Sequence, residues 1–177
     1  MKKNEILGKM SIEMGNFSEV LIPIAISMLM FVSTLVRVPF YPVPFTLQTL
    51  ALPLICFFSS RKHALWGIVL FTACRVMQAG SEIFLTIGYI MGFFAMVWIL
   101  TSKTRVTGVL KLFARVIWAQ FVALFLGAIV LSLSIGLKRA FVCGFLFFAL
   151  ADILKAIIAV GVYNLVASKA KKFSMER

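Results

Sequence analysis

Long apolar runs alternate along this chain with short polar stretches. Six apolar segments can be delimited, and charged or helix-breaking residues separate them. A helix that crosses the hydrocarbon core needs about 20 apolar residues, a length that the first, fourth, fifth and sixth segments satisfy. The six segments are Val20–Val36, Leu47–Ser60, Ala64–Met77, Ile83–Leu100, Val116–Ile135 and Phe141–Ala167.

The second and third segments are shorter, at about 14 residues each, and a re-entrant hairpin is the alternative to two spans. Such a hairpin would place Arg61, Lys62 and His63 at its tip, inside hydrocarbon. Charged groups there cost at least about 2.5–3.5 kcal/mol each. The pattern therefore predicts an all-α, polytopic membrane protein with six transmembrane helices.

This reading divides the chain into three parts. Residues 19–168 form the predicted transmembrane domain, and residues 169–177 form a basic cytoplasmic tail. Residues 1–18 mix lysine and glutamate, so we expect a cytoplasmic segment that lies on the membrane surface or is disordered.

Composition supports the membrane class, because 62% of the 177 residues are hydrophobic and the mean hydropathy is +1.06. The formal charge of +12 would also suit a nucleic-acid-binding protein. Here, however, the basic residues form short clusters between apolar runs, which is the pattern of membrane topology rather than of a nucleic-acid interface. Nucleic acid is therefore not an expected partner.

The basic residues also predict an orientation. If the N-terminus lies inside the cell, most of the 18 Lys and Arg residues fall in cytoplasmic segments, as the positive-inside rule requires. Both termini are then cytoplasmic. Lys138 and Arg139 are local exceptions on the outer side.

A proline-rich stretch interrupts the pattern between the first two segments. Three of the five prolines fall between Pro39 and Pro44, so this stretch cannot be helix interior. Irregular backbone at membrane depth survives where it is buried in protein or lines a cavity. We expect helix to resume at about Thr46, with its hydroxyl as N-cap, and Gln48 to follow in the first turn. The stretch is interpreted as the rim of a small-molecule pocket; a plain connecting loop is the alternative.

Two ionisable residues, Asp152 and Lys155, lie inside the sixth apolar segment. Their i, i+3 spacing puts them on one helix face, about 4.5 Å apart along the axis. Because both are costly in lipid, that face must look into the protein. One interpretation is a self-neutralised pair that pins the helix to its neighbours. The other is a ligand site, in which Lys155 receives a carboxylate and Asp152 accepts hydrogen bonds from N–H groups.

Residues suited to catalysis or metal binding are scarce. Asp152 is the one acid inside a predicted span, the single histidine His63 lies in a basic turn, and the three cysteines have no neighbouring His or Cys at ligand spacing. We therefore expect no enzyme activity, no metal and no cofactor, with a small membrane enzyme as a remote alternative. The chain has no ATPase motif, so an ATP-driven mechanism would need other chains.

The segment Pro42–Thr49 reads Pro-Val-Pro-Phe-Thr-Leu-Gln-Thr and resembles the signature segment of the BioY family. BioY proteins are bacterial integral-membrane proteins for biotin uptake, usually the substrate-binding (S) components of energy-coupling factor (ECF) transporters. The family also carries an Asp and, three residues later, a Lys near the start of its last helix, and both contact biotin. Asp152 and Lys155 match this pair, with Phe148 just upstream.

The resemblance implies biotin uptake across the bacterial cytoplasmic membrane, through a pocket near the outer face. Lys155, assisted by Arg75, would receive the valerate carboxylate, although Arg75 could instead snorkel to the headgroups. The ureido ring would meet Asp152 and nearby polar groups. The implied partners are biotin, the lipid bilayer, and an ECF coupling subunit with its ATPase pair. The predicted substrate-binding residues are Phe45, Thr46, Gln48, Arg75, Tyr89, Asp152 and Lys155.

The sequence departs from the family pattern in three places. The family usually has prolines before the Phe and before the Asp of its last helix, whereas Phe147 and Leu150-Ala151 stand here, so the helix is expected to start earlier. The loop between the third and fourth helices is shortened. The first helix has few small residues for docking a coupling subunit, so operation without a shared module stays open.

Two pairs of small residues, Gly88 with Gly92 and Ala123 with Gly127, have the spacing of close helix contacts and are interpreted as packing. Two further functions remain as alternatives to biotin uptake. One is an S component for another vitamin, and the other is a non-transporting structural membrane subunit whose Asp152–Lys155 pair serves stability alone.

Overall fold

The computed structural model describes residues 2–39, 45–79, 83–102 and 108–175. Within these ranges the chain is helical apart from one short strand pair and the connections. The last helix has three consecutive parts, named α6, η2 and α7, of which η2 is a π-helical turn. The helices are α1 (Lys2–Leu35), α2 (Gln48–Phe58), α3 (Arg61–Ala79), α4 (Ile83–Leu100), α5 (Val109–Ile135), α6 (Leu137–Phe141), η2 (Val142–Leu146) and α7 (Phe147–Met175).

The predicted class, a helical membrane protein with six helices, is confirmed. In the described part of the chain, three helical stretches are long and apolar enough to cross a bilayer: Phe17–Leu35, Val109–Ile135 and Leu137–Phe173. Two shorter apolar helices, Gln48–Phe58 and Ile87–Leu100, accompany them. The last helix begins at Leu137, earlier than the apolar run that starts at Phe141. This agrees with the expectation that the helix starts earlier where the family's prolines are replaced.

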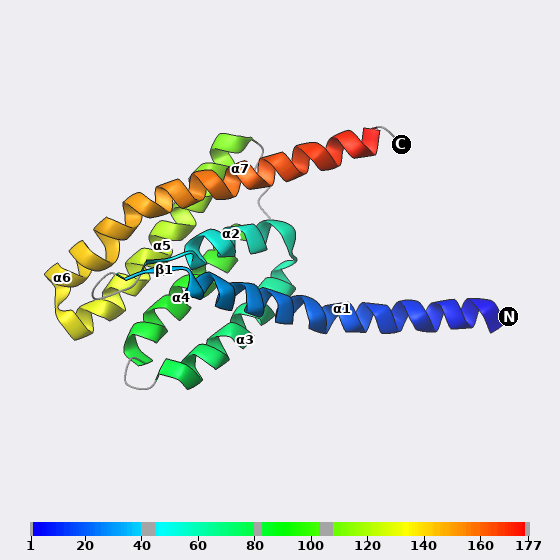
Figure 1. Cartoon of the computed structure of the whole chain (residues 1–177), viewed down its shortest axis with the longest axis horizontal. Helices are drawn as coiled ribbons and strands as arrows, with labels where there is room; N and C mark the ends of the chain where they lie inside the picture. Colours follow the sequence, from blue (N-terminus) through cyan, green and yellow to red (C-terminus); the bar gives the residue numbers. More distant parts are fainter. Residues whose placement is uncertain (1, 40–44, 80–82, 103–107, 176–177) are drawn as a thin grey trace.

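Both chain ends project from the same end of the bundle, as Figure 1 shows. An even number of crossings requires this, whereas their cytoplasmic location stays a prediction from the basic residues. Residues 2–18 of the predicted cytoplasmic N-terminal segment are part of helix α1, and their place relative to the membrane stays a prediction. One uninterrupted helix runs from Lys2 to Leu35, because no break separates the polar head from the apolar run.

A two-stranded antiparallel ribbon replaces helix on both sides of the proline-rich stretch. Strand β1 (Arg37–Val38) pairs with β2 (Phe45–Thr46), and Arg37 lies opposite Thr46. The prediction that helix is excluded here is confirmed on both flanks, while residues 40–44 lie outside the described residues. Thr46 as N-cap is wrong: ribbon pairing keeps Thr46 extended, and α2 begins at Gln48 with Leu47 as its N-cap.

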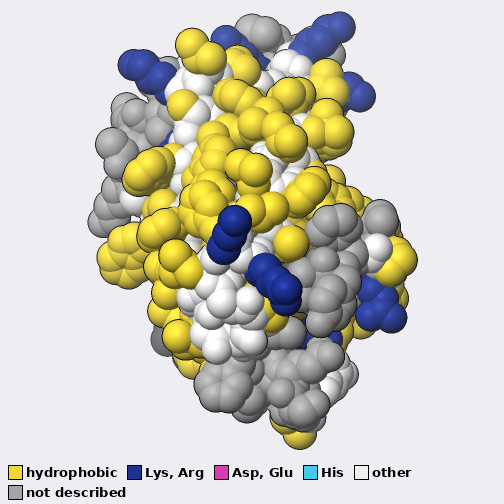
Figure 2. Space-filling model, turned by 90° about the vertical axis from the view of Figure 1, so that its left-hand side faces the viewer, with side chains coloured by type: hydrophobic (Ala, Val, Ile, Leu, Met, Phe, Trp, Pro, Cys, Tyr) yellow, Lys and Arg dark blue, Asp and Glu magenta, His cyan; other side chains and the backbone are white. Residues whose placement is uncertain are grey.

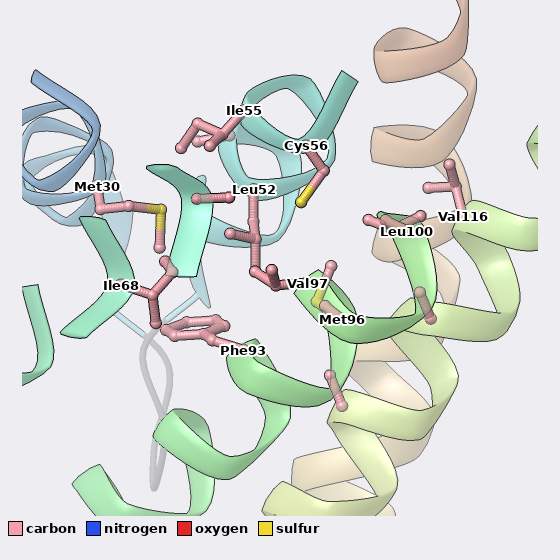
Figure 3. Packing of buried hydrophobic residues seen from close by; sticks show 14 of the residues in the cluster. Met30, Leu52, Ile55, Cys56, Ile68, Phe93, Met96, Val97, Leu100 and Val116 are labelled. Carbon is pink, nitrogen blue, oxygen red and sulfur yellow. The ribbon is translucent and has the colours of Figure 1, made fainter. Parts of the chain in front are cut away.

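The main hydrophobic core lies between α1, α2, α3 and α4 and continues to α5. Figure 3 shows side chains from these helices converging, with Met30 and Leu52 near Ile68. Met96, like Met30 and Leu52, is fully buried. Methionine side chains are unbranched and flexible, so they fill irregular gaps between packed helices.

Close backbone contact joins α4 to α5, which confirms the packing role of the small residues. A Cβ atom placed on Gly92 would lie 2.9 Å from the carbonyl oxygen of Ala123. One placed on Gly88 would lie 3.4 Å from the Cα of Gly127. Without a strong hydrophobic driving force between helices in lipid, such close approach supplies much of the association energy.

A similar contact joins α1 to α3 at Gly67, where a Cβ atom would lie 2.3 Å from Cγ2 of Ile26. We expect Gly67→Ala to destabilise the fold by about 1–3 kcal/mol, the usual cost of overpacking. Thermal unfolding of the purified protein in detergent should show a lowered midpoint. Gly161→Ala is the matched control, because nothing lies within 4 Å of its added Cβ, and it should hold or raise the midpoint. Equal midpoints for both variants would contradict the tight α1–α3 contact.

Candidate substrate-binding site

A buried ammonium group, that of Lys155 on α7, lies at the centre of the polar residues in this bundle. Its Nζ donates to the Thr46 carbonyl at 2.9 Å, to Thr49 Oγ1 at 2.7 Å and to Asp152 Oδ1 at 3.0 Å. A lysine ammonium has three N–H donors. All three are therefore engaged, and they connect α7 to β2 and to the first turn of α2.

Asp152 is the ionic partner of Lys155, as their spacing predicted. Its Oδ1 accepts a second hydrogen bond, from Thr49 Oγ1 at 2.7 Å. The two residues are 2% and 5% exposed, so the pair faces protein and not lipid. Asp152 Oδ2 is also buried and has no hydrogen-bond partner among the described residues.

An aromatic ring completes the surroundings of the ammonium. The ring centroid of Phe45 lies 3.8 Å from Lys155 Nζ, which is a cation–π contact. The same ring lies 5.6 Å, centroid to centroid, from that of Phe148 on α7. The strand that follows the proline-rich stretch is thus held to α7 by both a polar and an aromatic contact.

Sequence reasoning missed two polar residues that support this cluster. Gln120 on α5 is 1% exposed and donates from Nε2 to the Thr49 carbonyl at 3.0 Å. Thr49 in turn contacts both members of the ion pair. An amide within the apolar run of α5 was the available signal, since a buried polar group in a membrane helix must find a partner inside the protein.

A cavity of about 440 Å³ opens beside this cluster, in the half of the bundle away from the chain ends. All six helices and both strands contribute to its wall. Its volume lies in the range of small-molecule sites, about 300–1,000 Å³. The lining residues are Phe31, Thr34, Leu35, Arg37, Thr46, Gln48, Thr49, Phe71, Arg75, Gln78, Tyr89, Ile90, Gly92, Phe93, Ala123, Leu124, Phe148 and Lys155.

Five of the seven predicted substrate-binding residues line this one cavity, although they are distributed over five elements. They are Thr46, Gln48, Arg75, Tyr89 and Lys155. Asp152 and Phe45 do not line it, and each contacts Lys155 instead. Asp152 as a direct partner of ligand N–H groups therefore stays a prediction. The predicted shortening of the loop between α3 and α4 falls on residues 80–82, which lie outside the described residues.

The cavity wall is positively charged. Arg37, Arg75 and Lys155 line it, whereas the two acids with described side chains, Glu19 and Asp152, do not. Figure 2 views the molecule from the end away from the termini, and among the described side chains seen from this side several are Lys or Arg and none is Asp or Glu. An anionic solute is the ligand that such a site would attract and hold.

A six-helix membrane bundle that encloses a small cavity with cationic and aromatic walls has the architecture of a membrane protein with a small-molecule site. The family model described as the BioY family matches residues 10–172, and the chain belongs to that family. No curated protein and no solved structure matches the chain. Membership implies an S component for vitamin uptake, which works with an ECF module and is a component of a transporter.

Breaking the buried ion pair on one side should be costly to stability. In Lys155→Met, the Asp152 carboxylate loses its partner, and we expect a loss of about 3–5 kcal/mol. The double variant Lys155→Met with Asp152→Asn removes both charges and should recover most of that loss. Thermal or denaturant unfolding in detergent measures both. A double variant no more stable than Lys155→Met would show that charge pairing is not what holds α7 in place.

Proposed function

We propose that this protein binds biotin in the 440 Å³ cavity and serves its uptake across the cytoplasmic membrane of a bacterium. The observation that carries the proposal is the charge of the wall: three cations, and no acid among the described lining residues. Biotin presents one carboxylate on an apolar chain and one polar, uncharged ring. A cavity with cations and aromatic walls suits both parts.

The carboxylate is assigned to Lys155, with Arg75 as a second cation. Both residues line the cavity, and Lys155 is the more deeply buried. Because its three donors are engaged, an incoming carboxylate takes the place of one present acceptor, such as the Thr46 carbonyl. A carboxylate adds the attraction of a full negative charge to a hydrogen bond from the ammonium, which the neutral Thr46 carbonyl does not, and this favours the replacement.

The ureido ring is assigned to the uncharged polar groups of the wall, namely Thr46, Gln48 and Tyr89. The Thr46 hydroxyl donates to Gln48 Oε1 at 2.9 Å, so the Gln48 amide nitrogen is turned away from that bond. Amide groups carry both donors and acceptors and therefore match a urea. Asp152 contributes by holding Lys155 through Oδ1. Its Oδ2 has no described partner and accepts from the ring only if the ligand reaches behind the residues that line the cavity.

Two rival functions are kept. An S component for another vitamin would use the same cationic wall with a different ring pocket. A non-transporting subunit with a structural ion pair is favoured by one observation, that every donor of Lys155 already has an acceptor inside the protein. The two rivals differ in whether any anionic vitamin binds at all.

Equilibrium binding of labelled biotin to the purified protein in detergent tests the proposal. Lys155→Ala should weaken binding by about 1.5–3 kcal/mol, roughly tenfold to hundredfold. Arg75→Gln should weaken it in the same direction, and this substitution leaves the buried pair intact. Lys138→Ala is the control, because Lys138 is exposed and lies outside the cavity, and it should leave binding unchanged.

Competition by unlabelled ligands separates the possibilities. Biotin methyl ester, which lacks the charge, should compete far more weakly than biotin with the wild type. The difference in affinity between biotin methyl ester and biotin should be smaller in Arg75→Gln than in the wild type. Displacement of the label by another vitamin more strongly than by biotin would assign the site to that vitamin. If a monodisperse, thermally stable wild type binds neither biotin nor any other vitamin tested, the structural-subunit function remains.

A further inference from the structure

A second, open groove lies between α3 and α4, separate from the ligand cavity. Its volume is about 650 Å³. Two cations stand at the beginning of α3, and apolar side chains follow along the next turns and on the facing side of α4. The lining residues are Arg61, Lys62, Leu65, Trp66, Val69 and Phe94.

Exposed tryptophans place the cationic end of this groove at a membrane boundary. Trp66 on α3 and Trp98 on α4 are 56% and 64% exposed. The guanidinium carbon of Arg61 lies 3.7 Å from the centroid of the Trp98 ring, so the start of α3 and the end of α4 are at one level. Exposed tryptophans in membrane helices gather at the headgroup level.

The cations of the groove are only partly neutralised. Among the described residues no carboxylate pairs with Arg61, which stacks on Trp98. Lys62 pairs with Glu19 of α1, and both side chains remain at least half exposed. The Arg61 charge is therefore uncompensated by any described acid at this end of the groove.

We propose that the groove binds one anionic phospholipid. Its phosphodiester lies at Arg61 and Lys62, and one acyl chain follows Leu65, Val69 and Phe94 toward the bilayer interior. Arg61, Leu65 and Val69 are spaced by four residues, so they line one face of α3 over about 12 Å. The planar guanidinium suits a phosphate, and basic sites at the membrane surface attract anionic lipids. The occupant must be amphiphilic, because the cations lead into apolar surface and not into a closed pocket.

Native mass spectrometry of the intact protein in a non-ionic detergent tests this site. The probe is an equimolar mixture of phosphatidylglycerol and phosphatidylcholine with identical acyl chains. We expect one retained lipid, with phosphatidylglycerol preferred. Arg61→Gln and Lys62→Gln should each lower the preference by about fivefold, the effect of one surface cation. The double variant Lys138→Gln with Arg139→Gln removes two exposed cations from the other end of the bundle and should keep the preference.

Two further measurements distinguish loss of the lipid site from misfolding of a variant. Val69→Phe keeps both cations and fills part of the acyl surface, so it should lower retention of phosphatidylglycerol while unfolding at the wild-type temperature. Free glycerol phosphate should not displace the lipid, because it lacks the acyl chain. Equal preference in the Arg61 variant and in the Lys138 and Arg139 variant would overturn the proposal. So would a wild type that retains the two lipids equally, or displacement by glycerol phosphate.

Discussion

Burying one ammonium group determines how this bundle is arranged around its cavity. Lys155 can stay charged inside a membrane protein only if every N–H donor meets an acceptor, and the three acceptors come from Thr46, Thr49 and Asp152. These residues belong to β2, α2 and α7, so the hydrogen bonds fix the position of the ribbon relative to the last helix. Gln120 extends the same constraint to α5 by holding the backbone of Thr49.

The cavity follows from this constraint. Because the ribbon is drawn toward α7, Arg37 on the opposite strand and Thr46 both come to face the cavity. Aromatic residues from α1, α3 and α4 supply apolar wall between the cations. A site built in this way combines one buried, fully hydrogen-bonded cation with two arginines for which no ion-pair partner is described. If the proposed function holds, stability and ligand recognition depend on the same residue, Lys155.

Most of the helices could be predicted from the sequence, because the length of an apolar run and the charges that flank it are properties of the local sequence. The Asp152–Lys155 pair could also be found, since its spacing alone places both residues on one face. Arg37 as a cavity residue could not, because it reaches the cavity only through a strand pairing of two residues on each side. The Thr46 cap failed for the same reason: pairing with Arg37 overrides the local preference of a threonine before a helix.

Gln120 shows a different limit. Its position inside an apolar run indicates that its amide needs a hydrogen-bond partner within the protein. That partner is a backbone carbonyl in α2, about 70 residues away in the chain. A sequence pattern does not indicate which backbone carbonyl will accept such a hydrogen bond. The π-helical turn at Val142–Leu146 is similar, because it lies within an apolar run that also suits an ordinary helix.

The backbone contact between α4 and α5 has a consequence for shape selection. Gly92 and Ala123 both line the ligand cavity, and a Cβ atom on Gly92 would lie 2.9 Å from the Ala123 carbonyl oxygen. Side chains adapt to a guest by changing rotamer, but a surface made largely of main chain has no such freedom. The part of the wall at Gly92 and Ala123 is therefore fixed in shape, and adjustment to different ligands falls to lining residues with long, rotatable side chains, such as Arg37, Gln48 and Arg75.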